Sequence, residues 1–140
     1  MTDKKLQRGF KLAHSESTLY TKDHQWVQTS KENIATIGLT DFVQDRLSDI
    51  LFVQLQERVE PISIGEKFGL VESIKTLLEL YTPLSGQIIE TNQLLIKQPS
   101  LINLKPYRDG WTIKIKIADP SQVSRLLSNE KYKAFINNLK

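Results

Sequence analysis

Lys75 lies where the residue types and spacing of this 140-residue chain best suit a chemical role. Apolar segments with strand character, 68–71 and 77–81, flank residues 72–76. Two strands joined by a few residues form a hairpin, and Lys75 falls at its tip. An exposed lysine there offers a nucleophilic ε-amine. Because a lysine at a hairpin tip is an ordinary feature, the position is a candidate site only together with other residues.

The rest of the sequence offers few groups for catalysis or metal binding. There is no cysteine, which excludes disulfides, thiolate metal sites and a cysteine nucleophile. The two histidines, His14 and His24, cannot build a metal site alone. The sequence has no Gly-rich phosphate loop, no Ser-His-Asp order and no paired-carboxylate signature. We therefore expect neither catalytic residues nor a metal site.

Short strand-like segments bounded by turns dominate the chain. They cover residues 19–28, 33–39, 50–55, 68–71, 77–81, 87–91 and 111–117. Segment 50–55 is apolar at five of its six positions, which predicts a strand covered on both faces. Apolar residues at every second position from Trp111 to Ile117 predict four core side chains on one face, with Trp111 among them.

Helical signals occur in two places. Thr40 is a good N-cap for a short helix near 41–48, and Asp119 followed by Pro120 begins C-terminal helices near 120–138. Pro99 forbids a long helix in the less regular stretch 92–103. Many short strands followed by a helical tail predict a mainly β fold, a small sandwich or barrel closed by helices.

Length and composition favour one domain over residues 18–140, preceded by a flexible extension over 1–17. No apolar run reaches transmembrane length, and the extension resembles neither a secretory signal nor a mitochondrial targeting peptide. We therefore expect a cytoplasmic protein without a membrane partner.

Charge is unevenly distributed along the chain. The net charge is −6 over residues 23–90 and +6 over residues 91–140. This pattern fits a solvated surface with internal charge pairing, or a surface whose two poles face different partners. The scattered basic residues, without interleaved aromatics, do not favour nucleic-acid binding.

The residues around Lys75 resemble the H protein of the glycine cleavage system. The resemblance begins with Val71 to Lys75 followed by Leu80 to Gly86. Further matching segments are 20–27, 34–41, 49–55, 106–117 and 119–121. They follow the order and spacing of that family over about residues 18–136.

The resemblance implies a lipoyl-domain-like barrel-sandwich hybrid of two antiparallel sheets, with C-terminal helices packed on it. It implies that Lys75 carries lipoic acid in amide linkage, attached by a lipoate-protein ligase or a lipoyl/octanoyl transferase. In that family the arm takes an aminomethyl group from a pyridoxal-phosphate-dependent glycine decarboxylase. A tetrahydrofolate-dependent aminomethyltransferase unloads it, and dihydrolipoyl dehydrogenase reoxidises it with FAD and NAD. The H protein itself is a non-catalytic, cytoplasmic carrier in bacteria.

The resemblance also assigns roles to residues near the arm. Glu72 matches the position associated with recognition by lipoylating enzymes, and Glu79 keeps the carboxylate expected in the arm cleft. Gln25 replaces a glutamate that is expected to hold the amine of the loaded arm, so that hold should be weaker. Leu77 and Leu78 replace small or polar residues, and strand alternation predicts that only one of them is exposed.

These departures leave two alternatives to a glycine cleavage role. One is a lipoyl relay or scaffold that serves other lipoate-dependent complexes or a redox role. The other is an unmodified binding module that has kept the fold.

Overall fold

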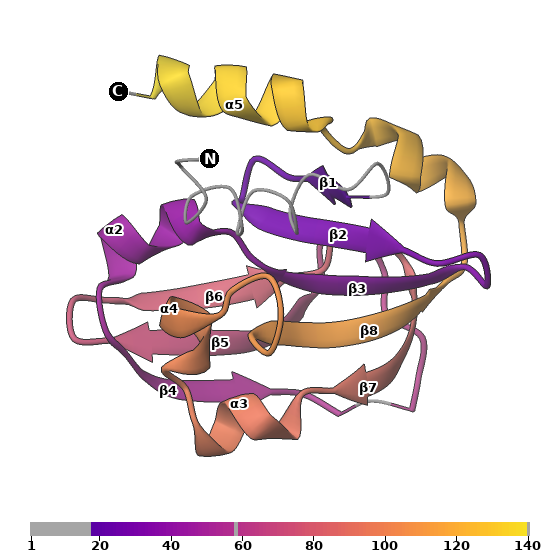
Figure 1. Ribbon diagram of the computed structural model, residues 1–140. Helices are drawn as coiled ribbons and strands as arrows, with labels where there is room; N and C mark the ends of the chain where they lie inside the picture. The colour runs from indigo at the N-terminus through magenta and orange to yellow at the C-terminus, as the bar shows by residue number, and fades with distance from the viewer. Residues whose placement is uncertain (1–17, 58, 140) are drawn as a thin grey trace.

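The computed structural model describes residues 18–57 and 59–139, and it has two antiparallel β-sheets with helices at their edges (Figure 1). The larger sheet contains, in the order in which they lie side by side, β1 (Thr18–Tyr20), β2 (Gln25–Thr29), β3 (Ile34–Leu39), β8 (Trp111–Ile117) and β7 (Gly86–Thr91). The smaller sheet contains β4 (Ile50–Leu55), β5 (Lys67–Ser73) and β6 (Leu77–Tyr81). The predicted flexible extension, 1–17, lies outside the described residues.

Six short helices complete the described fold. They are η1 (Asp41–Val43), α2 (Gln44–Leu47), α3 (Gln93–Lys97), α4 (Leu101–Leu104), η2 (Pro120–Arg125) and α5 (Asn129–Asn138). The helices expected near 41–48 and 120–138 are therefore confirmed. Thr40 occupies the N-cap position, but its side chain makes no capping bond, since its Oγ1 lies 2.7 Å from the Tyr132 hydroxyl. Pro99 separates α3 from α4, as its lack of an N–H predicts.

The main core lies between the two sheets. Fully buried side chains from both sheets meet there, including Ile37, Val53, Val71, Ile113 and Ile115. This confirms the predicted mainly β fold with two antiparallel sheets. The arrangement is a sandwich, because no strand ladder among the described residues joins the two sheets into a closed barrel.

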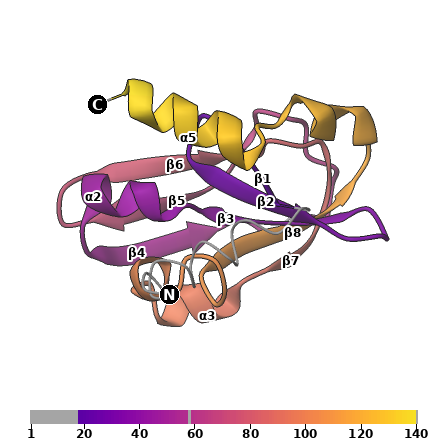
Figure 2. The same ribbon diagram turned by 45° about the horizontal axis from the view of Figure 1, so that its top comes forward.

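A second cluster covers the outer face of β1 and β2. Trp26 and Tyr20 pack there under α5, and the Tyr20 ring stacks on the Tyr132 ring at a centroid distance of 4.8 Å. Figure 2 shows α5 crossing these strands. The C-terminal helix thus fixes the first strands, and with them the turn between β1 and β2 that forms part of the site.

The single strand expected over 19–28 is wrong, because a turn divides it into β1 and β2. The Thr21 hydroxyl accepts hydrogen bonds from the backbone N–H groups of Asp23 and Gln25, at 3.1 and 3.2 Å. His24 takes a left-handed backbone conformation with φ of 65°. A threonine hydroxyl that bonds to the backbone nearby favours a turn over an extended strand.

The expectation that both faces of β4 are covered is also wrong. Ile50 pairs with Ser73 and Phe52 pairs with Glu72, so Leu51 is the extra residue of a bulge. Leu51 and Phe52 are 59% and 49% exposed. The bulge shifts the alternation of the strand, and it turns two large apolar side chains to solvent at one end of the small sheet.

A second bulge moves Trp111 away from the predicted core face. Gly38 pairs with Trp111 and Ile37 pairs with Ile113, which leaves Thr112 unpaired on β8. The buried Thr112 donates its hydroxyl to the Ile37 carbonyl at 2.9 Å. Trp111 is therefore only half-buried, with the Lys114 Nζ 4.9 Å from its ring centroid.

Candidate functional site

The Ser73 side chain shapes the hairpin tip that carries Lys75. Its Oγ accepts hydrogen bonds from the N–H groups of Lys75 and Thr76, both at 3.0 Å. The Ser73 N–H donates to the Thr76 carbonyl at 2.8 Å. Serine is favoured at the first position of such turns because its hydroxyl satisfies backbone groups that would otherwise lack partners. The turn confirms the predicted hairpin, and the Lys75 side chain is exposed at its tip.

A backbone hydrogen bond and the buried part of β5 fix this tip to the rest of the protein. The Ile74 N–H donates to the Asp49 carbonyl at 3.2 Å, which ties the turn to the segment between α2 and β4. Phe68 and Val71 of β5 are fully buried, so the strand that leads to the tip is anchored in the main core. Figure 1 shows the tip projecting at the same end of the molecule as α2. The Lys75 amine is thus held outward on a rigid support.

A cleft of about 320 Å³ lies beside the hairpin. Its walls are Leu78 to Tyr81 of β6, Lys22 to Gln25 of the β1–β2 turn and β2, and Arg46 of α2. Leu78 is the second residue of β6, so the cleft begins directly after the turn that carries Lys75. A flexible group attached to the Lys75 amine can therefore fold back into this cleft.

The structure brings two of the predicted site residues, Gln25 and Glu79, together in this cleft. Gln25 is only 3% exposed, and its Nε2 donates to the Tyr81 carbonyl at 2.9 Å. This bond joins β2 to the edge strand β6. It leaves the amide oxygen of Gln25 as the acceptor that this side chain can offer to a bound group.

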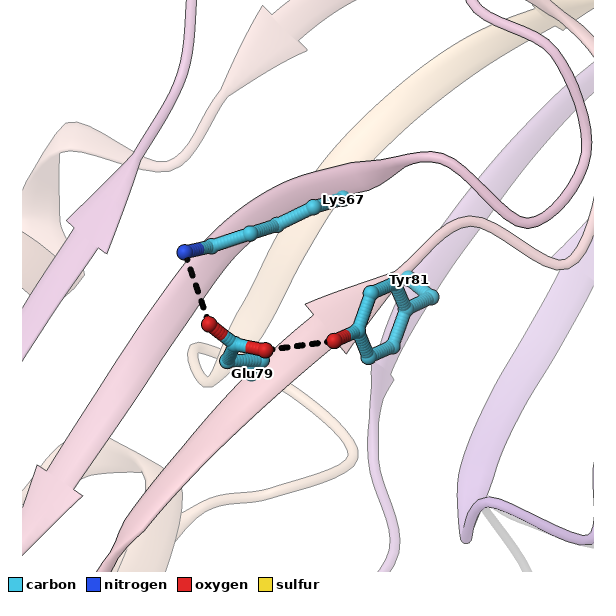
Figure 3. Close-up of polar contacts among 3 residues, drawn as sticks. All are labelled: Lys67, Glu79 and Tyr81. Carbon is cyan, nitrogen blue, oxygen red and sulfur yellow. Dashed lines mark hydrogen bonds and ion pairs between the residues drawn. The ribbon is translucent and has the colours of Figure 1, made fainter.

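Glu79 holds a fixed negative charge at the cleft. Its carboxylate accepts a hydrogen bond from the Tyr81 hydroxyl and pairs with the Lys67 Nζ at 3.0 Å (Figure 3). The Tyr81 bond and then the Lys67 ammonium lower the pKa of Glu79, so this carboxylate is ionised at neutral pH. Lys67 and Tyr81 were not predicted as site residues, although alternation places Tyr81 on the same face as Glu79.

His24 lines the cleft and links it to the C-terminal helix. Its Nδ1 lies 2.9 Å from the Tyr132 hydroxyl, and its ring contacts the Phe42 ring at a centroid distance of 4.5 Å. Burial, and then the nearby Arg46, lower the pKa of His24, while Asp23 opposes this shift. His24 is therefore neutral at pH 7, and the charge of the cleft depends on its lysine, arginine and carboxylate groups.

Glu72 lies apart from the cleft, on the outer face of β5. It pairs with Phe52 on one side and with Leu77 on the other, and it is exposed. Leu77 is 50% exposed while Leu78 packs against the main core, which confirms that only one of the two leucines faces solvent. Glu72 is thus beside the tip, where a protein that approaches Lys75 would meet it.

Among residues 18–57 and 59–139, no group of three or more histidine or acidic side chains is placed to hold a metal ion. Within the same part of the chain, no helix has the length and apolar character needed to cross a membrane.

Comparisons with known proteins agree on one family. The family model described as glycine cleavage H-protein matches residues 18–139. Glycine cleavage system H proteins from two strains of Staphylococcus epidermidis are 45% and 44% identical over 117 residues, covering 84% of this chain and 92% of theirs. A crystal structure of the glycine cleavage system H protein from Mycobacterium marinum matches with a TM-score of 0.74 and 32% identity. That match covers 86% of this chain and 96% of the other.

Proposed function

This chain belongs to the glycine cleavage H-protein family, and on that premise we propose that Lys75 carries the lipoyl group of a glycine cleavage carrier. Proteins of this family are lipoyl carriers of the glycine cleavage system and act as carrier subunits. The observation that supports Lys75 most directly is its exposed amine on a turn held by Ser73. Acylation removes the lysine charge and leaves the arm attached to a rigid support.

The residues around Lys75 fit a lipoyl group. Bound there, lipoic acid supplies a disulfide that accepts the aminomethyl group. The cleft beside β6 offers apolar wall from Leu78 and Leu80, and a charged end at Glu79. We assign Gln25 and Glu79 to the arm cleft, with the ionised Glu79 attracting the amine of the cargo and the Gln25 oxygen accepting a hydrogen bond from it.

The partners follow from this role. The glycine cleavage system supplies a glycine decarboxylase that loads the arm and an aminomethyltransferase that unloads it. We further propose dihydrolipoyl dehydrogenase as the enzyme that reoxidises the arm. A lipoate-protein ligase or a lipoyl/octanoyl transferase attaches it. A carrier arm raises the effective concentration of its end at each of these active sites.

Intact-mass measurement tests the modification. The full chain, incubated with a purified lipoate-protein ligase, lipoic acid and ATP, should gain the mass of one lipoyl group, located on Lys75 by peptide mapping. An unmodified control carrier that gains the mass of one lipoyl group in the same reaction establishes that the ligase is active. An unchanged mass for this chain under those conditions would exclude the carrier role and favour an unmodified binding module.

Substitution of two glutamates of the hairpin should separate the attachment of the lipoyl group to Lys75 from the protection of the group that the arm carries. Glu72→Gln should slow acylation of Lys75 about fivefold, since a charge-assisted contact to the modifying enzyme becomes neutral. Glu79→Gln should leave acylation unchanged and shorten the lifetime of the glycine-derived cargo about fivefold. Both residues are exposed strand positions, so each variant serves as the matched control of the other.

The measurements are the rate of mass gain for the unmodified chain and the decay of isotope label from glycine on the lipoylated chain. Equal effects of the two substitutions in both assays would contradict the assigned roles. Their thermal midpoints should match the wild type, because Glu72 is exposed and the exposed ion pair of Glu79 with Lys67 contributes little to stability.

A further inference from the structure

The sheet surface beside Lys75 is apolar and open to solvent. Phe52, Glu72 and Leu77 form one row across the small sheet, in which Phe52 pairs with Glu72 and Glu72 pairs with Leu77. Side chains of directly paired residues lie about 5 Å apart on the same face. The bulge residue Leu51 and the tip residue Ile74 extend this surface, at 59% and 61% exposure.

The four apolar residues of this surface are not part of the main core. Two of them result from the β4 bulge, and Ile74 directly precedes the candidate lysine. The Glu72 carboxylate in its middle has no hydrogen-bond or ion-pair partner among the residues that the structure describes. Exposed apolar side chains on both sides of one unpaired charge suit a partner with an apolar face and a cation.

We propose that Leu51, Phe52, Ile74 and Leu77 form the docking surface for the enzyme that acylates Lys75, an inference that rests on the proposed function of that lysine. In this step the neutral Lys75 amine attacks the carbonyl of an activated acyl donor. The amide C–N bond forms, the bond from the carbonyl to the leaving group breaks, and the amine proton is released.

The acylating enzyme is the partner that must come closest to this surface. The bare Lys75 amine must reach into the enzyme's active site, so the enzyme surface comes within one lysine side chain of Ile74 and Leu77. Enzymes that act later meet only the end of a long arm, and they need not touch the tip. None of the residues of the row lines the arm cleft, whose β6 residues, Leu78 to Tyr81, begin after Leu77.

The test compares acylation rates of unmodified full-length variants by intact mass, with purified lipoate-protein ligase, lipoic acid and ATP. Phe52→Ser combined with Leu77→Ser should lower kcat/KM of the ligase for the carrier by at least about tenfold, mainly through KM. Ile89→Ser is the matched control, because Ile89 is a strand residue of β7 with the same 49% exposure as Phe52. It should acylate at the wild-type rate.

Each alternative result is distinguishable. If the wild type itself gains no lipoyl mass, the proposed function of Lys75 fails, and this inference fails with it. If the wild type and the double variant acylate at equal rates while both have the wild-type thermal midpoint, only the docking surface is overturned. A third result also overturns the docking surface: the double variant acylates normally but, once lipoylated, loses exchange activity with glycine decarboxylase. The surface would then bind the decarboxylase and not the acylating enzyme.

Discussion

Lys75→Ala should reduce glycine–bicarbonate exchange with the decarboxylase to the background measured without carrier protein. The reason is chemical: alanine has no amine to acylate, and no other residue of the hairpin tip offers one. The thermal midpoint should remain within about 2 °C of the wild type, because substitution of an exposed turn side chain changes stability by about 0.5 kcal/mol or less. Exchange of labelled bicarbonate into glycine, together with a thermal melt, measures both effects.

Two controls separate the loss of the amine from the loss of charge. Lys75→Arg keeps the positive charge, but its guanidinium stays protonated and does not accept the acyl group, so exchange should also stop. Lys131→Ala removes an exposed lysine from α5 and should leave exchange unchanged. Residual exchange with Lys75→Ala, or a large fall in its thermal midpoint, would show that Lys75 is not the attachment point or that its side chain is packed.

Much of the hairpin was predictable because its determinants are local. Strand-forming segments on both sides of residues 72–76 and the short connection between them are read directly from residue order. The turn bonds of Ser73 are local as well, since they involve the N–H groups of the next residues. Local chemistry of this kind needs no knowledge of how distant segments pack.

The cleft was predictable only through the family resemblance. Gln25 and Glu79 are far apart in the sequence, and they meet because β2 lies beside the edge strand β6, where Gln25 bonds to the Tyr81 carbonyl. The Lys67 partner of Glu79 depends on the register between β5 and β6, which pairs Lys67 with Tyr81. Neither the pairing of sheets nor the register follows from the spacing of the residues alone.

Bulges explain the two failures of the alternation argument. A period of two assumes an uninterrupted ladder, but Leu51 and Thr112 each add one residue to a strand. The first bulge exposes apolar residues that were predicted to be covered. The second turns Trp111 away from the main core. Each bulge depends on the partner strand, so the sequence of the bulged strand gives no sign of it.

The second large effect concerns Trp26, the buried tryptophan of the cluster under α5. Trp26 is 2% exposed, and its ring lies so close to Gly38 that a Cβ there would come within 2.5 Å of it. Its Nε1 donates to the Pro106 carbonyl at 2.9 Å. Trp26→Ala should therefore lower the free energy of unfolding by about 3–5 kcal/mol, through the cavity and the lost hydrogen bond.

Trp111→Ala is the matched comparison, since it removes the same side chain from a half-buried position. It should cost about 1–2 kcal/mol, because only part of the ring is removed from water and its Lys114 partner is itself only half-buried. Urea unfolding with unchanged m-values measures both losses. Equal losses for the two tryptophans would mean that the Thr112 bulge is absent and that Trp111 does face the main core. A small loss of unfolding free energy for Trp26→Ala would instead mean that α5 does not cover the outer face of β1 and β2. The turn between these strands forms one wall of the arm cleft, so this packing also bears on the site.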